Sequence, residues 1–587
     1  MVNSKQLAEQ ATIQSFLNCY LRETGNSNEK KAGMIRVITL ENQNIEVLIP
    51  VKYWSPTGRH LFSFPVMYQS KGGGKPVPAD YLSLVSLLAK ELLLKQGRED
   101  AEDELVLRVI LSCKNMKETI EQRLDDAGKL TEEQFTFIEA EQSLLLGHLL
   151  HPTPKSKQGM LPGEELIFSP EFKGEFPLHY FKVHHSLILQ DSTLNQPAVE
   201  IVRRMLLDDP AVPREFAVNH CMDEDFYLVP AHPLQARELV KQPAVQKLIE
   251  EGQMVDIGCT GSPFTPTSSL RTVYRKTSRF MFKFSVPIKI TNSLRANKPK
   301  ELHRGVEISR LLQTELGKEL KNRYPGFTIV EDPGYLSVGT EEEESGFEIV
   351  IRENPFYEND RNASLIAGLC QDVPYSGKNR LFSIIQSIAQ KENRTTDDVS
   401  RDWFQSYLSL SLEPMLWLYK QYGLALEAHQ QNSIVRLSDD GYPAEFYYRD
   451  NQGYYYAESK AHRLKQLLPD LNGKSETICS DATAEERFRY YLIFNHLLGL
   501  INGFGTAGLA DETVLLDLLR KALARHEEDD SGSLVQSLLN EPVLPCKANL
   551  LTRLHDKDEL VGSLEEQSVY VNVTNPIAQR AEVAHGE

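Results

Sequence analysis

The part of the sequence best suited to chemistry is a cationic segment in the middle of the chain. The whole chain is acidic, with 82 Asp and Glu against 64 Lys and Arg and a net charge of −18. A local excess of positive charge on an acidic protein predicts a pocket for a small anion rather than a surface for a polyanion. Residues 265–300 contain no Asp or Glu and nine cations: Arg271, Arg275, Lys276, Arg279, Lys283, Lys289, Arg295, Lys298 and Lys300.

Hydroxyl and amide side chains accompany these cations. Thr267, Ser268 and Ser269 precede the first arginine, and Thr291 and Asn292 lie further along the same segment. Arginine forks combined with hydroxyl and amide groups suit the oxygens of phosphates and carboxylates. We therefore expect this segment to bind such groups.

One of the cations is predicted to lie on a β-strand. Phenylalanine occupies every second position from 280 to 284, which is the period of a strand with one apolar face. Residues 270–274 are expected to form its partner strand. Lys283 then points away from the phenylalanine face. Taken alone, such a lysine is more often found on a solvated face, and that alternative stays open.

A histidine-containing loop precedes the cationic segment. His148 and His151 are three residues apart, a spacing that would let them share a helix face as metal ligands. Pro152 and Pro154 instead favour an extended loop, and no third ligand is close in sequence. The two histidines with Lys155 are better suited to gripping phosphate oxygens.

Two polar motifs occur in the last third of the chain. Residues 427–432, EAHQQN, follow a predicted apolar helix directly, and Arg449-Asp450 ends a strand-like run a short hairpin later. A carboxylate, a histidine and an amide within six residues would suit a Mg-nucleotide site. A plain polar helix end is the alternative for EAHQQN.

The elements that must position these groups change character along the chain. Helices are expected at 6–23, 79–94 and 101–126, and two strands within 36–51. Beyond residue 395 the pattern turns helical, at 403–426, 485–500 and 511–525. Because 587 residues are too many for one core, we expect several domains, divided as 1–130, 131–395 and 396–587. The first contains no chemistry and is expected to serve as scaffold or subunit contact.

Several other functions are excluded by the sequence. Residues 503–508 match GxGxxG but follow a helical pattern rather than a strand, which excludes a dinucleotide fold. The seven cysteines form no CxxC pair, which favours reduced thiols in the cytoplasm over disulfides or a thiolate zinc site. No secretory signal or bilayer-spanning stretch is visible. The acidic balance argues against nucleic acid and membranes as partners.

The motifs together resemble one family. GHLLHPTPKSKQG, TPTSSLRT, KITNSLR, EAHQQN, YYRD and CKANLLTR occur in the order seen in the NRPS-independent siderophore synthetases of the IucA/IucC type. The resemblance runs from about residue 8 to about residue 576. It implies an α+β fold shaped like a cupped hand, with an N-terminal thumb, mixed α/β fingers carrying an antiparallel sheet, and a largely helical palm. Nucleotide and citrate are expected between fingers and palm.

The resemblance also implies an activity. A synthetase of this family uses ATP to adenylate citrate and condenses the citryl-adenylate with an amine, releasing AMP and pyrophosphate. A closer likeness at both ends of the chain implies spermidine as the amine, on the way to a citrate-based catecholate siderophore. ATP and Mg²⁺ are the expected cofactors, and a homodimer is the expected assembly. Another amine or a citryl-monoamide substrate is the nearest alternative; a non-catalytic nucleotide binder and a phosphotransferase are more distant ones.

Site roles are carried over from the family motifs. Leu149 stands where the family often has proline, which leaves open whether the first or the second histidine of the loop faces the phosphates. Lys283, Arg295 and His429 are the expected catalytic residues, and Glu427 and Asp450 the expected metal ligands. The expected citrate site comprises Thr291, Arg295, His429 and Lys547. The expected ATP site comprises His148, His151, Lys155, Ser268, Ser269, Arg271, Lys283, Asn292, Glu427, Asn432 and Asp450.

Overall fold

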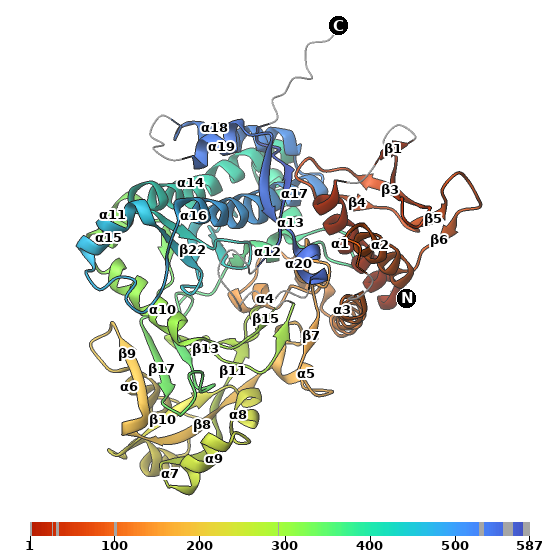
Figure 1. Ribbon diagram of the computed structural model, residues 1–587. Coiled ribbons are helices and arrows are strands. Elements are labelled where there is room, and N and C mark those ends of the chain that lie inside the picture. Colours follow the sequence, from red (N-terminus) through yellow and green to blue (C-terminus); the bar gives the residue numbers. More distant parts are fainter. Residues whose placement is uncertain are drawn as a thin grey trace.

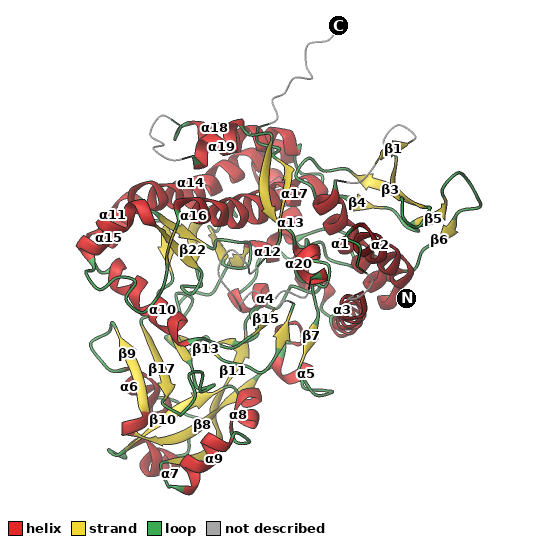
Figure 2. Ribbon diagram, in the orientation of Figure 1, coloured by secondary structure: helices red, strands yellow, loops and turns green. Residues whose placement is uncertain are grey.

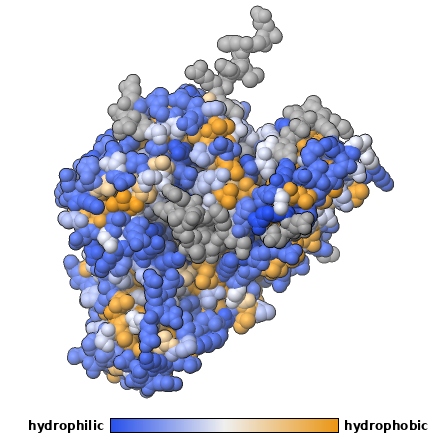
Figure 3. Space-filling view, viewed as in Figure 1, coloured by the Kyte–Doolittle hydropathy of each residue, from blue (hydrophilic) through white to orange (hydrophobic). Residues whose placement is uncertain are grey.

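The fold consists of three groups of elements that follow one another along most of the chain (Figure 1). It is known from a computed structural model, which describes residues 3–25, 28–30, 34–98, 102–291, 293–527, 533–555 and 568–578. Helices and antiparallel sheets are both abundant (Figure 2), so the expected α+β class is confirmed. Hydrophilic side chains cover most of the face seen in Figure 3.

The N-terminal group combines three helices with a small antiparallel sheet. The helices are α1 (Ser4–Thr24), α2 (Tyr81–Lys95) and α3 (Glu102–Gln122). Helix α1 begins after Asn3, whose side chain accepts a hydrogen bond from the Gln6 amide, and ends at Gly25 in the left-handed conformation. The strands are β1 (Asn28–Lys30), β2 (Ile35–Leu40), β3 (Ile45–Tyr53), β4 (Leu61–Phe62), β5 (Met67–Ser70) and β6 (Val77–Pro78).

The middle group is built on an eight-stranded sheet in which every neighbouring pair is antiparallel. Short helices gather at the end of this group remote from the C-terminal helices (Figure 1): α6 (Ala198–Leu207), α7 (Arg214–Phe216), α8 (Pro233–Leu239) and α9 (Pro243–Glu250). Helix α5 (Glu165–Phe168) lies apart from them. In spatial order the strands are β10 (Phe226–Ala231), β8 (Phe176–His184), β11 (Met254–Pro266), β12 (Thr272–Tyr274), β13 (Phe280–Phe284), β18 (Ile349–Glu353), β17 (Gly334–Val338) and β9 (Ile188–Ser192).

The two faces of β13 pack against different parts of the molecule. Phe282 and Phe284 belong to an apolar cluster with residues of α6 and α8, whereas Met281 belongs to the cluster of the C-terminal helices. The alternation read from the sequence is therefore confirmed. Lys283 shares the face of Met281, because side chains two apart on a strand point the same way. That face is the one that meets the C-terminal group.

Two small elements connect the middle group to its neighbours. A three-stranded sheet joins β7 (Lys157–Gln158) to β14 (Lys289–Ile290) and β15 (Ser293–Leu294). It brings the histidine loop beside the end of the cationic segment. Helices α4 (Phe137–Glu141), α10 (Pro299–Leu312) and α11 (Glu315–Arg323) complete the connection.

The C-terminal group is largely helical around two small sheets. One sheet contains β16 (Phe327–Ile329), β22 (Pro443–Tyr448), β21 (Ser433–Leu437) and β19 (Ala363–Leu365); the other contains β20 (Leu424–Leu426), β23 (Tyr454–Ala457) and β24 (Ile478–Cys479). The pair β25 (Val543–Lys547) and β26 (Tyr570–Thr574) follows late in the chain. The helices are α12 (Ile366–Cys370), α13 (Arg380–Glu392), α14 (Thr396–Tyr422), α15 (Ala461–Leu467), α16 (Asp481–Phe488), α17 (Leu498–Thr506), α18 (Glu512–Ala524), α19 (Leu534–Asn540) and α20 (Asn549–Leu554).

The N-terminal and C-terminal groups share buried surface. Leu550 and Leu554 of α20 lie in the apolar core formed by α1, α2, β2 and β3. Arg59 donates to Asn502 and pairs with Asp372 at 2.6 Å. The largest apolar cluster includes residues from both sides of residue 395. The division into three domains stays a prediction.

The GxGxxG match and the helix expected at 403–426 have different outcomes in the structure. GxGxxG at 503–508 lies at the end of helix α17, as its rejection as a dinucleotide loop requires. The expected helix at 403–426 ends earlier, at Tyr422, because Gly423 adopts the left-handed conformation and residues 424–426 form β20. Among the described residues, none of the helices combines the length and apolar character needed to cross a bilayer.

Candidate active site

All three groups of elements contribute to one large cavity of about 690 Å³. Arg59 from the N-terminal group, Lys283 from the central sheet and His429 from the C-terminal group all line it. Among the described residues, six carboxylates line the cavity: Glu141, Glu171, Glu301, Glu427, Asp450 and Glu476. Thirteen cations outnumber them: Arg59, Lys155, Lys157, Arg271, Lys283, Arg295, Lys298, Lys300, Arg304, Arg352, Arg449, Arg487 and Lys547. This surplus of positive charge suits polyanionic ligands.

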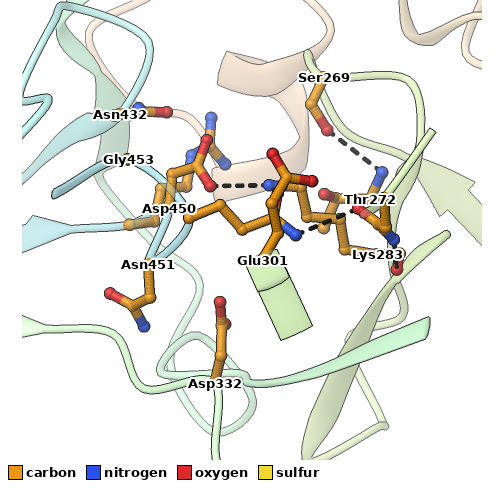
Figure 4. A network of polar contacts seen from close by, with 12 residues as sticks. Ser269, Thr272, Lys283, Glu301, Asp332, Asn432, Asp450, Asn451 and Gly453 are labelled. Atoms are coloured by element: carbon orange, nitrogen blue, oxygen red, sulfur yellow. Dashed lines mark hydrogen bonds and ion pairs between the residues drawn. The ribbon is translucent and has the colours of Figure 1, made fainter. Parts of the chain in front are cut away.

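An ion pair between a buried lysine and a partly buried aspartate joins the sheet to the C-terminal group at the cavity wall. Lys283 Nζ lies 2.7 Å from Asp450 Oδ1, and Figure 4 shows the two side chains pointing toward each other. Only 3% of the Lys283 side chain is exposed, so the alternative of a solvated lysine is wrong. Burial lowers the pKa of Lys283 to about 8, against the opposing effect of Asp450. The pKa of Asp450 is lowered because Lys283, Arg352 and Arg271 outweigh its burial.

The loop between β11 and β12 is held by a second buried ion pair. Arg449 Nη1 lies 2.9 Å from Glu141 Oε1, and Arg449 Nη2 also donates to the hydroxyl of Ser268. The Ser268 amide donates to Glu141 at 2.8 Å. Ser269 accepts a hydrogen bond from the Thr272 amide at 3.1 Å, as Figure 4 shows. The two predicted serines are therefore fixed at the cavity wall.

Arg271 belongs to an amide network beside this loop. Its Nη1 donates to Asn297 Oδ1 at 2.8 Å and its Nη2 to Gln452 Oε1 at 3.4 Å. Gln452 also donates to Asn297 at 3.1 Å. Burial lowers the pKa of Arg271. The guanidinium is thus oriented by neutral groups, which leaves its charge available to an anion.

The histidine loop borders the same cavity. His148 Nε2 contacts Asn495 Nδ2 at 2.8 Å, and His151 Nδ1 accepts from the Thr153 amide. Lys155 is buried and forms an ion pair with Glu171, which Lys157 also contacts at 3.1 Å. Burial lowers the pKa of Lys155 to about 8. Both histidines and Lys155 line the cavity, and their role in binding phosphate stays a prediction.

The residues expected to hold citrate approach the cavity from several segments. Arg295 Nη2 donates to the Ile290 carbonyl at 3.2 Å and to the Thr291 hydroxyl at 3.3 Å. Lys547 Nζ lies 5.8 Å from the centre of the Tyr490 ring. Arg295, Thr291, Lys547 and His429 all line the cavity, whereas Asn292 lies outside the described residues.

The EAHQQN motif forms a turn between strands β20 and β21. It does not follow a helix directly, so the alternative of a polar helix end is wrong. Asn432 Nδ2 donates to the Glu427 carbonyl at 3.2 Å, and His429 Nδ1 accepts from the Gln431 amide. Burial lowers the pKa of His429 to about 3, which keeps the ring neutral. Glu427 accepts a hydrogen bond from the Tyr455 hydroxyl at 2.7 Å.

Backbone strain also gathers at this cavity. Nine non-glycine residues of the described chain have positive φ, and four of them line it: Leu270, Thr291, Asp450 and Glu476. Such conformations cost free energy and cluster at binding and catalytic sites in proteins. Positive φ at Asp450, φ 91°, is part of what turns its carboxylate toward the sheet after β22 ends.

Comparisons with known proteins agree with this geometry. Residues 136–371 match the model of the IucA / IucC family. A spermidine-citrate ligase of Bacillus anthracis is 45% identical over 99% of this chain and 100% of its own length. The chain belongs to the IucA/IucC family. The rhizobactin siderophore biosynthesis protein RhbC of Rhizobium meliloti is 37% identical over 97% of this chain and 98% of its own.

Solved structures of IucA/IucC proteins have the same fold. The ATP-bound aerobactin synthetase IucA of Klebsiella pneumoniae superposes with a TM-score of 0.87 at 28% identity, covering 97% of this chain and 99% of that one. Residues 401–562 also match a model described as ferric iron reductase FhuF-like transporter. The IucA/IucC resemblance drawn from six motifs is thereby confirmed.

Several cavity residues of this IucA/IucC protein were not predicted from its sequence. Arg352 stands on β18 inside an apolar strand, and Glu141 ends the short helix α4. Arg487 precedes a π-helix at Arg489–Leu497, whose residues Tyr490, Tyr491, Phe494 and Asn495 line the cavity. The sequence carried one usable signal, a charged residue within an apolar strand pattern at 352. The π-helix carries no periodic signal, because its widened turn departs from the 3.6-residue repeat.

The cavity also bears on metal binding. Among the described residues, no three His, Cys, Asp or Glu side chains group closely enough to hold a metal ion. Glu427 and Asp450 both present carboxylate oxygens to the cavity, and oxygen is the ligand that Mg²⁺ prefers. Two carboxylates suit an ion that takes its remaining ligands from phosphates and water. The two predicted metal ligands therefore fit Mg²⁺ chemically.

Proposed function

We propose that this protein is an ATP-dependent ligase that joins citrate to spermidine through an amide bond in siderophore biosynthesis. The observation that carries the proposal is the full-length similarity to a spermidine-citrate ligase, at 45% identity. A related aerobactin synthetase binds ATP, which supports ATP as the energy source. The excess of positive charge in the cavity supports the same conclusion, because ATP and citrate are both polyanions.

The proposed reaction has two steps. A carboxylate oxygen of citrate attacks the α-phosphorus of ATP, and pyrophosphate leaves. The amine nitrogen of spermidine then attacks the activated carbonyl carbon, AMP leaves with the bridging oxygen, and the nitrogen loses a proton. ATP and citrate together bring roughly seven negative charges, so their approach requires nearby cations. The thirteen cations of the cavity supply them.

The chain's own residues divide this work. Lys283, Arg271 and the loop containing Ser268 and Ser269 are proposed to hold the phosphates. Arg295 can bind one citrate carboxylate through two parallel hydrogen bonds. His429 is kept neutral by burial and can accept or donate a hydrogen bond to citrate.

Mg²⁺ is proposed as the second cofactor. When bound, it would offset phosphate charge and favour departure of pyrophosphate. Glu427 and Asp450 are the residues proposed to hold it. Asp450 would then serve two partners, since it also pairs with Lys283.

Cellular location and assembly belong to the same proposal. All seven cysteines are free, which supports a reducing compartment, and we propose the cytoplasm. A homodimer remains our expectation for the assembly.

Product analysis tests the proposed function. The protein is incubated with ATP, Mg²⁺, citrate and a panel of amines. The products are then separated, and their masses are measured by mass spectrometry. We expect AMP, pyrophosphate and a product with the mass of citrate plus spermidine minus water. Formation of ADP would indicate a phosphotransferase, and ATP left intact would indicate a binding protein. Either outcome contradicts the proposal.

A further inference from the structure

A row of alternating charges runs behind the Lys283–Asp450 pair. Asp332 is fully buried, with 0% of its side chain exposed, and contacts Arg352 through both carboxylate oxygens. Arg352 Nε lies 2.6 Å from Asp332 Oδ1 and Arg352 Nη2 lies 2.9 Å from Oδ2. The same Nη2 lies 3.9 Å from Asp450 Oδ1. In Figure 4 the Asp332 side chain points from its loop toward this group.

The sheet register places the two cations of this row on one face. Lys283 of β13 stands opposite Val350, and Met281 opposite Arg352. Directly paired residues, and residues two apart on a strand, share a face of the sheet. Lys283 and Arg352 therefore both face the segment that follows β22, and Asp450 lies between them. Asp450 contacts Lys283 at 2.7 Å and Arg352 only at 3.9 Å.

This difference in distance needs a cause, because a guanidinium is the stronger partner for a carboxylate. An arginine fork normally takes a carboxylate through two parallel hydrogen bonds, which a lysine cannot do. Asp332 occupies that fork in the structure. Without it, Arg352 would be a buried cation whose nearest carboxylate is Asp450, and an uncompensated buried charge is strongly unfavourable.

We propose that Asp332 is a positioning residue: it saturates Arg352 and so keeps Asp450 paired with Lys283 rather than with Arg352. The inference rests on the proposed function, in which Lys283 and Asp450 act on the ATP side of the cavity. Asp332 contacts neither substrate in this scheme. It acts through Arg352, by setting where the Asp450 carboxylate points.

The obvious test is Asp332→Asn, which keeps the shape and removes the charge. We expect citrate-dependent ATP–pyrophosphate exchange to lose about 10- to 100-fold in kcat, because a displacement of about 1 Å at reacting groups has effects of that size. The KM for citrate should change little. Asp209→Asn is the matched control: Asp209, which follows helix α6, forms a similarly buried pair with Arg275 at the end of β12, and neither residue lines the cavity.

A double variant separates positioning from a merely structural role. In Asp332→Asn/Arg352→Gln the competing cation is gone, so Asp450 should return to Lys283 and exchange should be faster than in Asp332→Asn. It should stay below the wild-type rate, because Arg352 is itself one of the cations that line the cavity. A structural role predicts that the double variant is at least as impaired as the single one. The double variant buries no unpaired charge. It should therefore fold even if Asp332→Asn alone proves too unstable to assay.

The outcomes separate the two proposals. Exchange in the wild type, loss in Asp332→Asn, a normal rate in Asp209→Asn and recovery in the double variant support the inference. A normal rate in Asp332→Asn, or no recovery in the double variant, overturns the inference and leaves the ligase proposal standing. A wild-type enzyme without citrate-dependent exchange would remove the proposed function, and the inference with it.

Discussion

At the scale of single residues, the cavity depends on charges paired across long stretches of chain. Lys283 and Asp450 are 167 residues apart, and Arg449 and Glu141 are 308 apart. Lys283, Arg449 and Glu141 are buried, and Asp450 is partly buried. Each pair joins a segment of the C-terminal group to residues that precede it by more than a hundred positions. Removing one member therefore affects both stability and ligand binding, and a useful experiment must separate the two effects.

Lys283 offers such an experiment. Lys283→Met should lower kcat/KM for ATP by about 100-fold or more, since it removes a charge-assisted contact. It should also destabilise the fold by about 3–5 kcal/mol, because Asp450 loses its partner. Adding Asp450→Asn should restore stability to urea unfolding but not activity. If activity returned together with stability, Lys283 would have only a structural role.

Arg295 is predicted to bind citrate through its fork. Arg295→Ala should reduce citrate-dependent exchange by roughly 30-fold or more, from the loss of about 2–5 kcal/mol in a charge-assisted pair. Arg295→Lys should also be impaired, because a lysine cannot reproduce two parallel bonds. Arg275→Lys is the control within the same cationic segment, since Arg275 pairs with Asp209 away from the cavity. Exchange that survives in Arg295→Ala would remove this arginine from the citrate site.

His496 supports the turn that carries His429, and its protonation is testable. Its Nδ1 donates to the Ala428 carbonyl at 2.8 Å, so its Nε2 accepts from the Tyr407 hydroxyl and the ring is neutral. Burial lowers the pKa of His496 to about 3, below its unfolded value. The unfolded chain then binds a proton first, and stability falls as the pH drops below about 6.5.

Urea unfolding at pH 7 and pH 5 measures this effect. Relative to His496→Asn, the wild type should lose an additional amount of about 2 kcal/mol between these two pH values. His462→Asn, at an exposed histidine, should show no such difference from the wild type. An identical pH dependence in wild type and His496→Asn would mean that folding does not lower the pKa of His496.

At the scale of elements, helix α20 ties the end of the chain to its beginning. Leu550 is 0% exposed and lies in the core formed by α1, α2 and the first sheet. Leu550→Ala should therefore cost about 2–5 kcal/mol of stability to urea unfolding, as expected for a buried cavity. Leu551, only partly buried, is the control and should cost clearly less when changed to alanine. Equal losses would show that α20 is not anchored through Leu550.

Local pattern predicted many elements correctly and for a physical reason. The phenylalanine alternation at 280–284 and the helix at 6–23 have strong periods, and both elements form as expected. The segment 485–500 is helical as expected, but the π-helical form of Arg489–Leu497 was not predicted. Strand β20 lies where the helix at 403–426 was expected to continue, because three residues are too few to show a strand period. The family resemblance supplied the roles of the site residues; residue types and spacing alone indicate an oxyanion pocket and a Mg-nucleotide site.

Pairing between distant residues could not be predicted in this way. Glu171 holds Lys155, and Asp332 holds Arg352, but both carboxylates lie in segments without a distinctive pattern. Which cation meets which carboxylate depends on how the sheet and the C-terminal group pack. The sequence identified several cations of the site, among them Lys155, Lys283 and Arg271, but not Glu171 and Asp332, which orient two of the cavity's cations.

At the scale of the whole molecule, the chain is acidic overall whereas its cavity is rich in positive charge. The chain carries a net charge of −18, whereas cations exceed carboxylates at the cavity wall. An acidic exterior attracts a polycationic amine, while the cavity attracts ATP and citrate. One enzyme can thus collect substrates of opposite charge. This arrangement is what an adenylating citrate–polyamine ligase requires.

In the proposed reaction, a citrate carboxylate attacks the α-phosphorus of ATP. Citrate labelled with ¹⁸O in its carboxyl groups tests this most directly, in a reaction with unlabelled ATP and spermidine. When the amine displaces AMP, the bridging oxygen leaves with AMP. We predict one labelled oxygen in AMP for each amide formed, and none in pyrophosphate. Unlabelled AMP, or label transferred to inorganic phosphate together with formation of ADP, would contradict the account.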